Sequence, residues 1–418
     1  MMFAKALAIV LLICLITASP GLAVHPDVHV WGPEEKEHMR SLWLGSLPAL
    51  PDDPSNAYDA DPQAAALGKK LFFDKRLSAN GMVSCATCHI PDQTFTDNLP
   101  IAHGIDDTTR RSMPLAGTAC SPWLFWDGRA DSLWAQALTP IERPEEHGIS
   151  RTKCALIIQA HYRQEYEKIF GPMPPLKADI SELARPAPDN PAIQALWDKI
   201  PAADRQAISR LFVNLGKAIA AFVRTITFSP TPFDNYAAAV LKGDLKTAAQ
   251  LFTADQAVGL RLFINKAQCI NCHNGPLFTN NDFHNVGVPP RPGKEPDNGR
   301  GSGIGLVLTS EFNCLSIYSD AEPSDCAELR FIDNDPQKYA GALKTPSLRN
   351  VALRPPYMHA GQFETLQDVL HFYQQEAQKR EQGQQKGVTD IVHGELTDED
   401  IDLIIMFLQT LNSPLLTY

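Results

Sequence analysis

The stretch Cys85-Ala86-Thr87-Cys88-His89 has a second version in the same chain, Cys269-Ile270-Asn271-Cys272-His273. A Cys-x-x-Cys-His run is the attachment signature of a c-type haem. Its two thiols can add to the two vinyl groups of the macrocycle, and the histidine that follows can ligate the iron. A redox or zinc Cys-x-x-Cys pair could also precede a histidine, but two copies behind an export signal favour haem. We therefore expect two covalently bound haem c groups, with His89 and His273 as proximal iron ligands.

The first 23 residues are typical of a secretory signal peptide. Lys5 supplies the positive charge, residues 6–17 form a short apolar core, and Gly21-Leu22-Ala23 is a small-x-small cleavage site. The apolar run is too short to span a membrane comfortably, and no later stretch resembles a transmembrane helix. We expect a soluble periplasmic protein without a membrane span.

The amino-acid composition limits the kinds of molecule that the protein is expected to bind. Of the 418 residues, 44% are hydrophobic and 20% are charged, as in a soluble globular protein of two to four domains. The formal net charge of -11 argues against nucleic-acid binding and favours a basic protein partner.

The cysteines outside the haem motifs predict disulfides. Once the signal peptide and the two motifs are set aside, an even number remains in an oxidising compartment. Cys314 and Cys326 lie on either side of a polar insertion, and a disulfide between them would cross-link its two ends. A bond between Cys120 and Cys154 is then predicted by elimination, with free buried thiols as the alternative.

A repeated pattern predicts the fold class. The helical pattern at 64–73 contains Gly-x-x-Leu-Phe before the first haem motif, and 257–263 repeats it before the second. Such an internal repeat indicates a duplicated unit. We predict a mainly α-helical protein of two cytochrome c-like domains, residues 24–232 and 233–418, each with one covalently bound haem, plus long irregular loops.

Other segments give local predictions. Residues 203–226 have an amphipathic helical pattern, whose apolar stripe consists of Leu211, Leu215, Ile219 and Phe222. Thr397 is expected to cap a final helix over 401–411. Residues 24–63 are predicted to be an irregular arm and residues 289–305 a loop, since both are rich in helix-breaking residues.

Several further motifs resemble those of bacterial dihaem cytochrome c peroxidases, a family that includes the MauG type, which matures methylamine dehydrogenase. The resemblance covers Leu67 to Leu411 and rests on Leu71-Phe72-Phe73-Asp74, Arg76-Leu77-Ser78, Phe125-Trp126-Asp127-Gly128-Arg129, Cys272-His273-Asn274-Gly275-Pro276, Phe283-His284-Asn285, Lys344-Thr345-Pro346-Ser347-Leu348-Arg349-Asn350-Val351 and Pro356-Tyr357-Met358-His359. It implies an oxidoreductase in which the haem at His89 reacts with peroxide and the haem at His273 relays electrons to it.

The resemblance also implies a sixth ligand for the C-terminal haem. Typical peroxidases of the family have methionine at the position of Tyr373, whereas the maturation enzyme has tyrosine there. A phenolate ligand lowers the reduction potential, while methionine raises it. Met358 and His371 are alternative ligands, and Tyr373 could instead be an ordinary helix residue.

On the peroxide side the chain departs from the family pattern. The resemblance implies a glutamine just before the Phe-Trp-Asp-Gly-Arg motif and a glutamate ten residues later, but Leu124 and Trp134 stand at these positions. Peroxide cleavage needs a proton-transfer group. The candidate substitutes are Glu142 and Glu146, with Arg129 as a group that could stabilise charge, and each could equally be structural.

Three other features stay open. His103 resembles the removable distal histidine of many relatives, although it could be a polar loop residue. Trp123, Trp126 and Trp134 could carry electrons between the haems or could pack in the core. Relatives bind calcium at the domain interface, but its usual side-chain contributors do not map cleanly onto this chain.

Three functions are consistent with these observations. The first is a periplasmic dihaem peroxidase that reduces hydrogen peroxide with electrons from a small cytochrome c or cupredoxin. The second is a MauG-like enzyme that oxidatively modifies a partner protein, which Tyr373 favours. The third is a dihaem electron carrier or redox sensor, for which Leu124 and Trp134 are the evidence. Relatives are often dimers, so the resemblance also allows a homodimer.

Overall fold

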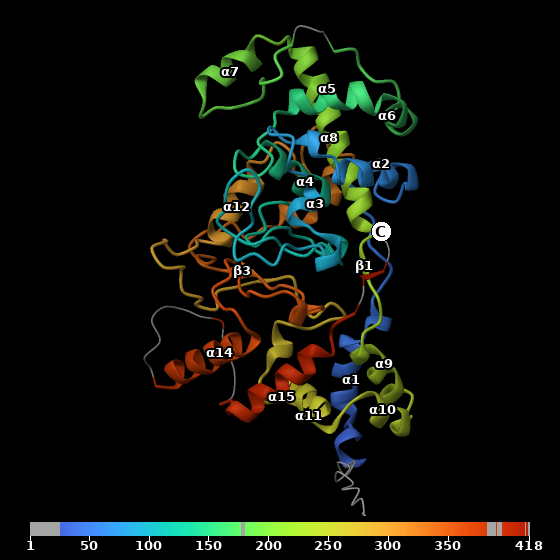
Figure 1. The fold of residues 1–418 in the computed structure, drawn as a ribbon, viewed down its shortest axis with the longest axis vertical. Coiled ribbons are helices and arrows are strands. Elements are labelled where there is room, and N and C mark those ends of the chain that lie inside the picture. Colours follow the sequence, from blue (N-terminus) through green and yellow to red (C-terminus); the bar gives the residue numbers. More distant parts are fainter. Residues whose placement is uncertain (1–25, 177–179, 383–389, 391–394, 414, 417–418) are drawn as a thin grey trace, which may run out of the picture.

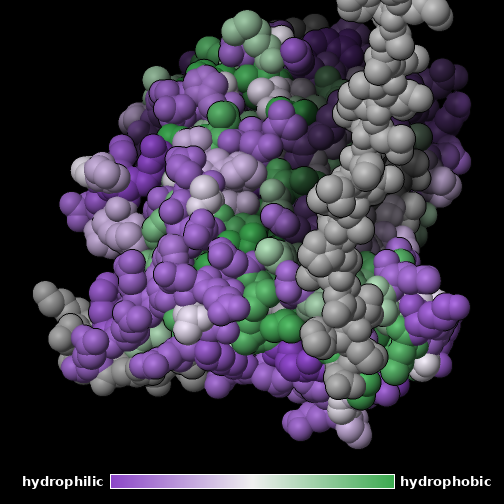
Figure 2. All heavy atoms as spheres, turned by 60° about the horizontal axis from the view of Figure 1, so that its bottom comes forward, coloured by the Kyte–Doolittle hydropathy of each residue, from purple (hydrophilic) through white to green (hydrophobic). Residues whose placement is uncertain are grey.

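The structure is a computed structural model that describes residues 26–176, 180–382, 390, 395–413 and 415–416. The predicted signal peptide, residues 1–23, lies outside the described residues. Within the described part, no helix combines the length and the apolar character needed to cross a membrane. The end of the molecule at the bottom of Figure 1 shows a largely hydrophilic surface with hydrophobic residues between the polar ones (Figure 2).

The described chain is mainly helical, as predicted, and its helices gather in two groups along the long axis of the molecule (Figure 1). The helices are α1 (Pro33–Leu42), α2 (Pro62–Phe72), α3 (Cys85–Cys88), α4 (Leu133–Glu142), α5 (Arg151–His161), α6 (Arg163–Phe170), α7 (Pro191–Asp198), α8 (Ala202–Arg224), α9 (Pro232–Leu241), α10 (Leu245–Leu251), α11 (Ala254–Ile264), α12 (Arg300–Leu308), α13 (Ala327–Arg330), α14 (Leu366–Glu381) and α15 (Asp398–Gln409). Two small antiparallel pairs join β1 (Thr227–Phe228) to β4 (Leu415–Leu416) and β2 (Phe283–His284) to β3 (Leu343–Lys344).

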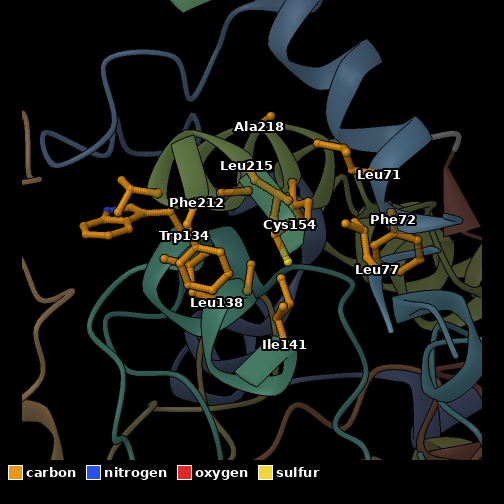
Figure 3. Close-up of a cluster of buried hydrophobic side chains, with 14 of the residues drawn as sticks. Leu71, Phe72, Leu77, Trp134, Leu138, Ile141, Cys154, Phe212, Leu215 and Ala218 are labelled. Carbon is orange, nitrogen blue, oxygen red and sulfur yellow. The ribbon is translucent and has the colours of Figure 1, made fainter. Parts of the chain in front are cut away.

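Each group of helices encloses its own hydrophobic core. The first core lies between α2, α4, α5 and α8, and Figure 3 shows part of it, including Leu71, Phe72, Leu138, Cys154, Phe212 and Leu215. The second core lies between α9, α11, α14 and α15. Burying these side chains away from water is the main force that holds each group together. The domain boundary after residue 232 stays a prediction, but the two cores divide near it.

The Gly-x-x-Leu-Phe repeat has the same structural role in both groups. In α2, a Cβ atom added to Gly68 would lie 1.9 Å from the carbonyl oxygen of Ala218 in α8. In α11, a Cβ atom added to Gly259 would lie 2.0 Å from the carbonyl oxygen of Leu403 in α15. Only glycine permits backbones to cross this closely. The helix before each Cys-x-x-Cys-His motif is thereby locked against a later helix of the same group.

Two helices confirm the patterns that predicted them. Helix α8 covers Ala202–Arg224, and all four residues of its predicted stripe are buried. Helix α15 begins at Asp398, after Thr397, whose hydroxyl accepts a hydrogen bond from the backbone N–H of Asp400 at 3.2 Å. The carboxylate of Asp400 accepts one in return from the N–H of Thr397 at 2.8 Å. This reciprocal pair satisfies donors that a helix N-terminus leaves open.

The N-terminal arm is more ordered than predicted. It contains helix α1, and its side chains Trp31, Met39 and Leu42 are buried in the second core. The indole N–H of Trp31 donates a hydrogen bond to the hydroxyl of Tyr236 at 2.8 Å. The arm therefore packs against the C-terminal group of helices, although it belongs to the N-terminal part of the sequence.

The predicted loop over residues 289–305 is wrong at its end, because helix α12 begins at Arg300. Two of its glycines, Gly301 and Gly303, lie close to other backbone atoms. A Cβ atom on Gly303 would lie 2.0 Å from the carbonyl oxygen of Asp127. The guanidinium of Arg300 donates to the carbonyl of Gly128 at 2.7 Å. Helix α12 thus supports the turn that contains Phe125-Trp126-Asp127-Gly128-Arg129.

One disulfide prediction is confirmed and the other is wrong. Cys314 and Cys326 are bonded, with their Cα atoms 5.7 Å apart. Cys120 and Cys154 are both free. Cys154 packs beside Phe212 and Leu215 in the middle of α8 (Figure 3), whereas the charge of Arg224, at the end of that helix, acts on Cys120. Nine residues of helix span about 14 Å, well beyond the reach of a disulfide.

Replacing Gly68 by alanine should destabilise the protein by about 3 kcal/mol or more, because the added methyl group would force α2 and α8 apart. Chemical denaturation followed by circular dichroism measures this loss. Gly305→Ala in α12 is the matched control, since no atom lies within 4 Å of the position that its methyl group would take. That variant should be neutral or gain up to about 1 kcal/mol. Equal stability of both variants would contradict the close crossing.

Candidate haem-binding sites

The two Cys-x-x-Cys-His motifs form the same local structure. In the first, one helical turn (α3) brings the backbone N–H of His89 to the carbonyl of Cys85 at 2.9 Å. In the second, a 3₁₀ turn at Cys269–Asn271 gives the same bond from His273 to Cys269, also at 2.9 Å. Both turns place the two cysteines and the histidine on a single compact segment.

A backbone carbonyl orients each histidine. The Nδ1 atom of His89 lies 3.1 Å from the carbonyl oxygen of Phe95, and that of His273 lies 3.1 Å from the carbonyl oxygen of Phe278. A hydrogen bond from Nδ1–H to a carbonyl leaves Nε2 as the nitrogen with the lone pair, which is the arrangement of metal-ligating histidines. Burial also lowers the pKa of His89 and so favours the neutral ring.

The two phenylalanines were missed by the sequence reasoning. Both are fully buried, and both have left-handed backbone angles, with φ of 55° at Phe95 and 53° at Phe278. This conformation is rare for a bulky residue. The signal in the sequence was a Phe-Thr pair that follows each motif, at residues 95–96 and 278–279.

In the part of the chain that the structure describes, the surroundings of the cysteines do not complete a zinc site. Burial raises the pKa of Cys85, Cys88 and Cys269 to about 12. A structural zinc ion usually has four protein ligands. Among the described residues, no group of three or more His, Cys, Asp and Glu side chains could hold a metal ion. The donor set therefore fits haem.

A cavity lies beside the first motif. Both Cys88 and His89 line it. Its other walls come from both groups of helices and from the loops between them, including Leu124, Phe125, Trp126, Leu277, Thr279, Lys344 and Pro346. The site is mostly apolar with a few polar groups, as expected of a cofactor pocket.

Helix α4 shows why Trp134 carries no polar role. Leu133, Gln136 and Pro140, which share one face at helical spacing, line the cavity. Trp134 points to the opposite side, where it is fully buried in the first core and donates its indole N–H to the hydroxyl of Ser55 at 2.8 Å. Leu124 and Trp134 therefore leave the family's two polar positions apolar, and Gln136, two residues after Trp134, is a polar residue of the cavity wall that the sequence did not single out.

Two of the predicted catalytic residues also line the cavity. Burial raises the pKa of Glu146, although the nearby Arg143 and Arg129 oppose this shift. The carboxylate of Glu146 lies 3.3 Å from the guanidinium of Arg143. The guanidinium of Arg129 lies 3.6 Å above the ring of Phe125 and 3.0 Å from the carboxylate of Asp127. A carboxyl group and positive charge thus face the same space.

Glu142 and His103 are placed differently. The carboxylate of Glu142 lies 2.8 Å from the buried guanidinium of Arg151 and does not line the cavity. This gives Glu142 a structural partner. The ring of His103 is 57% exposed and lies 2.7 Å from the carboxylate of Asp107. Its backbone carbonyl, however, lies 3.5 Å from the thiol of Cys88, so the loop itself borders the site.

Comparison with known proteins agrees with this geometry. A family model described as di-haem cytochrome c peroxidase matches residues 62–242. Methylamine utilization protein MauG of Methylorubrum extorquens is 32% identical over 323 residues, which cover 76% of this chain and 70% of that protein. Cytochrome-c peroxidase IdrP1 of Denitromonas iodatirespirans is 31% identical over 344 residues, 79% of this chain and 77% of the relative.

The chain belongs to the di-haem cytochrome c peroxidase family. It is therefore a peroxidase-like oxidoreductase with haem cofactors. The fold is shared with the diheme peroxidase BthA from Burkholderia thailandensis, with a TM-score of 0.61 at 24% identity over 86% of this chain and 89% of that one. It also resembles a MauG-like protein associated with microbial copper homeostasis, with a TM-score of 0.57 at 25% identity over 88% and 95% of the two chains.

Tyr373 lies on α14 and packs against the second core together with Cys269. Burial raises the pKa of its phenol well above the usual range, and the neighbouring thiols of Cys269 and Cys272 act in the same direction. Tyr373 is thus close to the second motif. A protonated, buried phenol would lose its proton on binding a metal cation.

The alternative candidates for the sixth ligand of the C-terminal haem, Met358 and His371, lie in different surroundings. Met358 lies at a turn with a left-handed φ of 66°. His371 is 35% exposed in its side chain and lies 3.7 Å from the carboxylate of Asp398.

Of the three tryptophans considered for electron transfer, Trp126 is the one that lines the cavity, and its ring lies 6.5 Å from that of His359 in the other half of the chain.

A buried ion pair holds the loop after the second motif. The guanidinium of Arg349 lies 2.9 Å from the carboxylate of Asp234, and both side chains are buried. Arg349 also donates to the carbonyls of Pro276 and Leu42, at 2.6 and 3.4 Å. It therefore ties together helix α9, the segment beyond His273 and the N-terminal arm.

Asp234→Asn should destabilise the protein by about 3 kcal/mol or more, because Arg349 would be left buried without its counter-charge. Burial alone would raise the pKa of Asp234, but the hydrogen bonds and charge of Arg349 outweigh it and lower the pKa. The pair therefore stabilises the fold at neutral pH, and this contribution is lost as the pH falls through the lowered pKa. Urea unfolding at pH 7 and near pH 3 measures both effects.

Asp244→Asn is the matched control for this measurement. Asp244 is an exposed N-cap residue of α10, and asparagine caps helices as well as aspartate does. We expect a change within about 0.5 kcal/mol for the control. A loss in Asp234→Asn no larger than that would show that the pair contributes little.

Proposed function

We propose that the protein reduces hydrogen peroxide to water in the periplasm, using electrons from a small cytochrome c or cupredoxin. Cys85, Cys88 and His89 would hold the haem that meets peroxide, and Cys269, Cys272 and His273 the haem that receives electrons. Residues 24–232 and 233–418 would form the corresponding domains. The observation that carries the proposal is the cavity beside His89, into which a carboxyl, an amide and a guanidinium face.

Haem, when bound, supplies the redox chemistry, and the protein sets its ligation, polarity and access. The overall reaction joins one peroxide, two protons and two electrons to give two waters. Glu146 can accept a proton from one peroxide oxygen and return it to the other, since a buried carboxyl group with a raised pKa suits both steps. Gln136 can orient the peroxide by hydrogen bonding, and Arg129 can stabilise developing negative charge.

The same contacts weigh against a mere electron carrier or redox sensor. That interpretation rested on Leu124 and Trp134, but polar groups enter the cavity from Gln136 and Glu146. Relatives support the enzymatic proposal further, since their names include cytochrome-c peroxidase and cytochrome c551 peroxidase. Export to the periplasm is supported by the predicted signal peptide over residues 1–23.

Glu146→Gln should slow peroxide reduction by about 10²- to 10⁴-fold, because the amide cannot transfer the proton. The measurement is stopped-flow mixing of the holoprotein with peroxide, followed by oxidation of a reduced cytochrome c. Glu145→Gln is the control, since this neighbour contacts Arg143 and does not line the cavity. It should keep its rate within about threefold of the unaltered protein. Unchanged rates in both variants would remove Glu146 as the acid–base group.

A second function is favoured by Tyr373. We infer that a tyrosine ligand beside Cys269 and Cys272 would give the C-terminal haem a low potential, as phenolate favours ferric iron. Such a haem is suited to sharing oxidising equivalents with the N-terminal haem and passing them to a partner protein. Relatives named methylamine utilization protein MauG support this candidate.

Tyr373→Met should raise the midpoint potential of the C-terminal haem by on the order of 100 mV, since methionine stabilises ferrous iron. Spectroelectrochemical titration of the holoprotein measures it. His371→Gln, which alters a neighbouring candidate ligand on the same helix, should leave the potential unchanged. If the midpoint potential shifted in His371→Gln but not in Tyr373→Met, the sixth ligand would be assigned to His371 in place of Tyr373.

A further inference from the structure

The wall of the cavity contains a buried lysine without a counter-charge. Lys344 lies on β3 and is only 6% exposed, and its backbone N–H donates to the carbonyl of Trp126 at 2.8 Å. It lines the cavity beside the first haem motif. Within the described ranges, its ammonium group has neither a hydrogen bond nor an ion pair. Burial lowers its pKa to about 8.

Two buried arginines lie at the same interface between the halves of the chain. Arg111 also lines the cavity, and its guanidinium donates to the backbone carbonyl of Arg354 at 3.0 Å. The guanidinium of Arg354 donates to the carbonyls of Ser347, Arg349 and Asn350, at 2.8, 2.8 and 3.1 Å. Burial lowers the pKa of Arg354 to about 9, and the charge of Arg111 adds to the effect. We call Lys344, Arg111 and Arg354 the cationic cluster.

Acidic groups balance the cluster only in part. The charge of Asp97 acts on Arg111 and offsets some of the cost of its burial, whereas no acid among the described residues acts in this way on Lys344. A buried cation without an anion is costly, because it loses its hydration without recovering Coulomb energy. Lys344 is such a group, and its position together with Arg111 on the wall of one cavity therefore indicates an anionic ligand.

We propose that Lys344 and Arg111, supported by Arg354, bind the carboxylates of the haem attached at Cys85 and Cys88. Haem carries two carboxylate side chains, on the edge of the macrocycle away from the vinyl groups that react with cysteine. A charged donor and a carboxylate form strong hydrogen bonds in a dry site. The inference rests on the proposed function in one respect only, that this cavity holds haem.

The test compares K344Q and K344R with K338Q in the holoprotein. Loss of a cation beside the haem carboxylates should lower the midpoint potential of the N-terminal haem and reduce thermal stability in K344Q, whereas K344R should retain both. K338Q is the control, because Lys338 is an exposed lysine paired with Asp333. Failure of K344Q to fold, with rescue in K344R, also supports the proposal, since a carboxylate would be left buried and unpaired.

An unchanged potential and unchanged stability in K344Q would overturn the inference while leaving the proposed function intact. The proposed function fails separately if the purified protein lacks the mass of two covalently added haems.

Discussion

Two glycines set the framework, because at Gly68 and Gly259 the backbone of a second helix crosses at a distance that excludes any side chain. The crossing helices then bury the residues on either side of each glycine. Each Cys-x-x-Cys-His motif follows its glycine helix by a short segment, so the crossing fixes where the motif begins. The left-handed turns at Phe95 and Phe278 aim the carbonyls that orient the two histidines. A duplicated backbone constraint thus produces two equivalent ligand positions.

The first cavity is a product of both halves of the chain. Trp126 and Arg129 reach it from a turn that α12 supports, and Lys344 reaches it from β3, more than two hundred residues later. Arg349 fixes the loop after the second motif through its buried pair with Asp234. The segments that resemble family motifs therefore act largely as supports for one interface. This explains why they are scattered along the sequence.

Local rules predicted the parts of the structure that depend on local chemistry. The stripe of α8, the capping of α15 by Thr397 and the duplicated motifs all follow from spacing along one segment. The direction in which a side chain points, and the residue that it pairs with, did not follow from spacing along the sequence. Counting ten residues from Leu124 led to Trp134, whereas the helical face of α4 presents Gln136 to the cavity. The pairing of Cys120 with Cys154 failed for the same reason, since elimination ignores distance across the core.

The buried charges connect the cofactor with the stability of the protein. Two members of the cationic cluster, Lys344 and Arg111, line the cavity, and among the described residues no acid acts on the charge of Lys344. A ligand that binds the folded state and supplies two carboxylates would relieve that penalty and so stabilise the fold. Covalent attachment at Cys85 and Cys88 would make the gain permanent. The same charges that are costly without a counter-ion would then select an anionic macrocycle and hold it in one orientation.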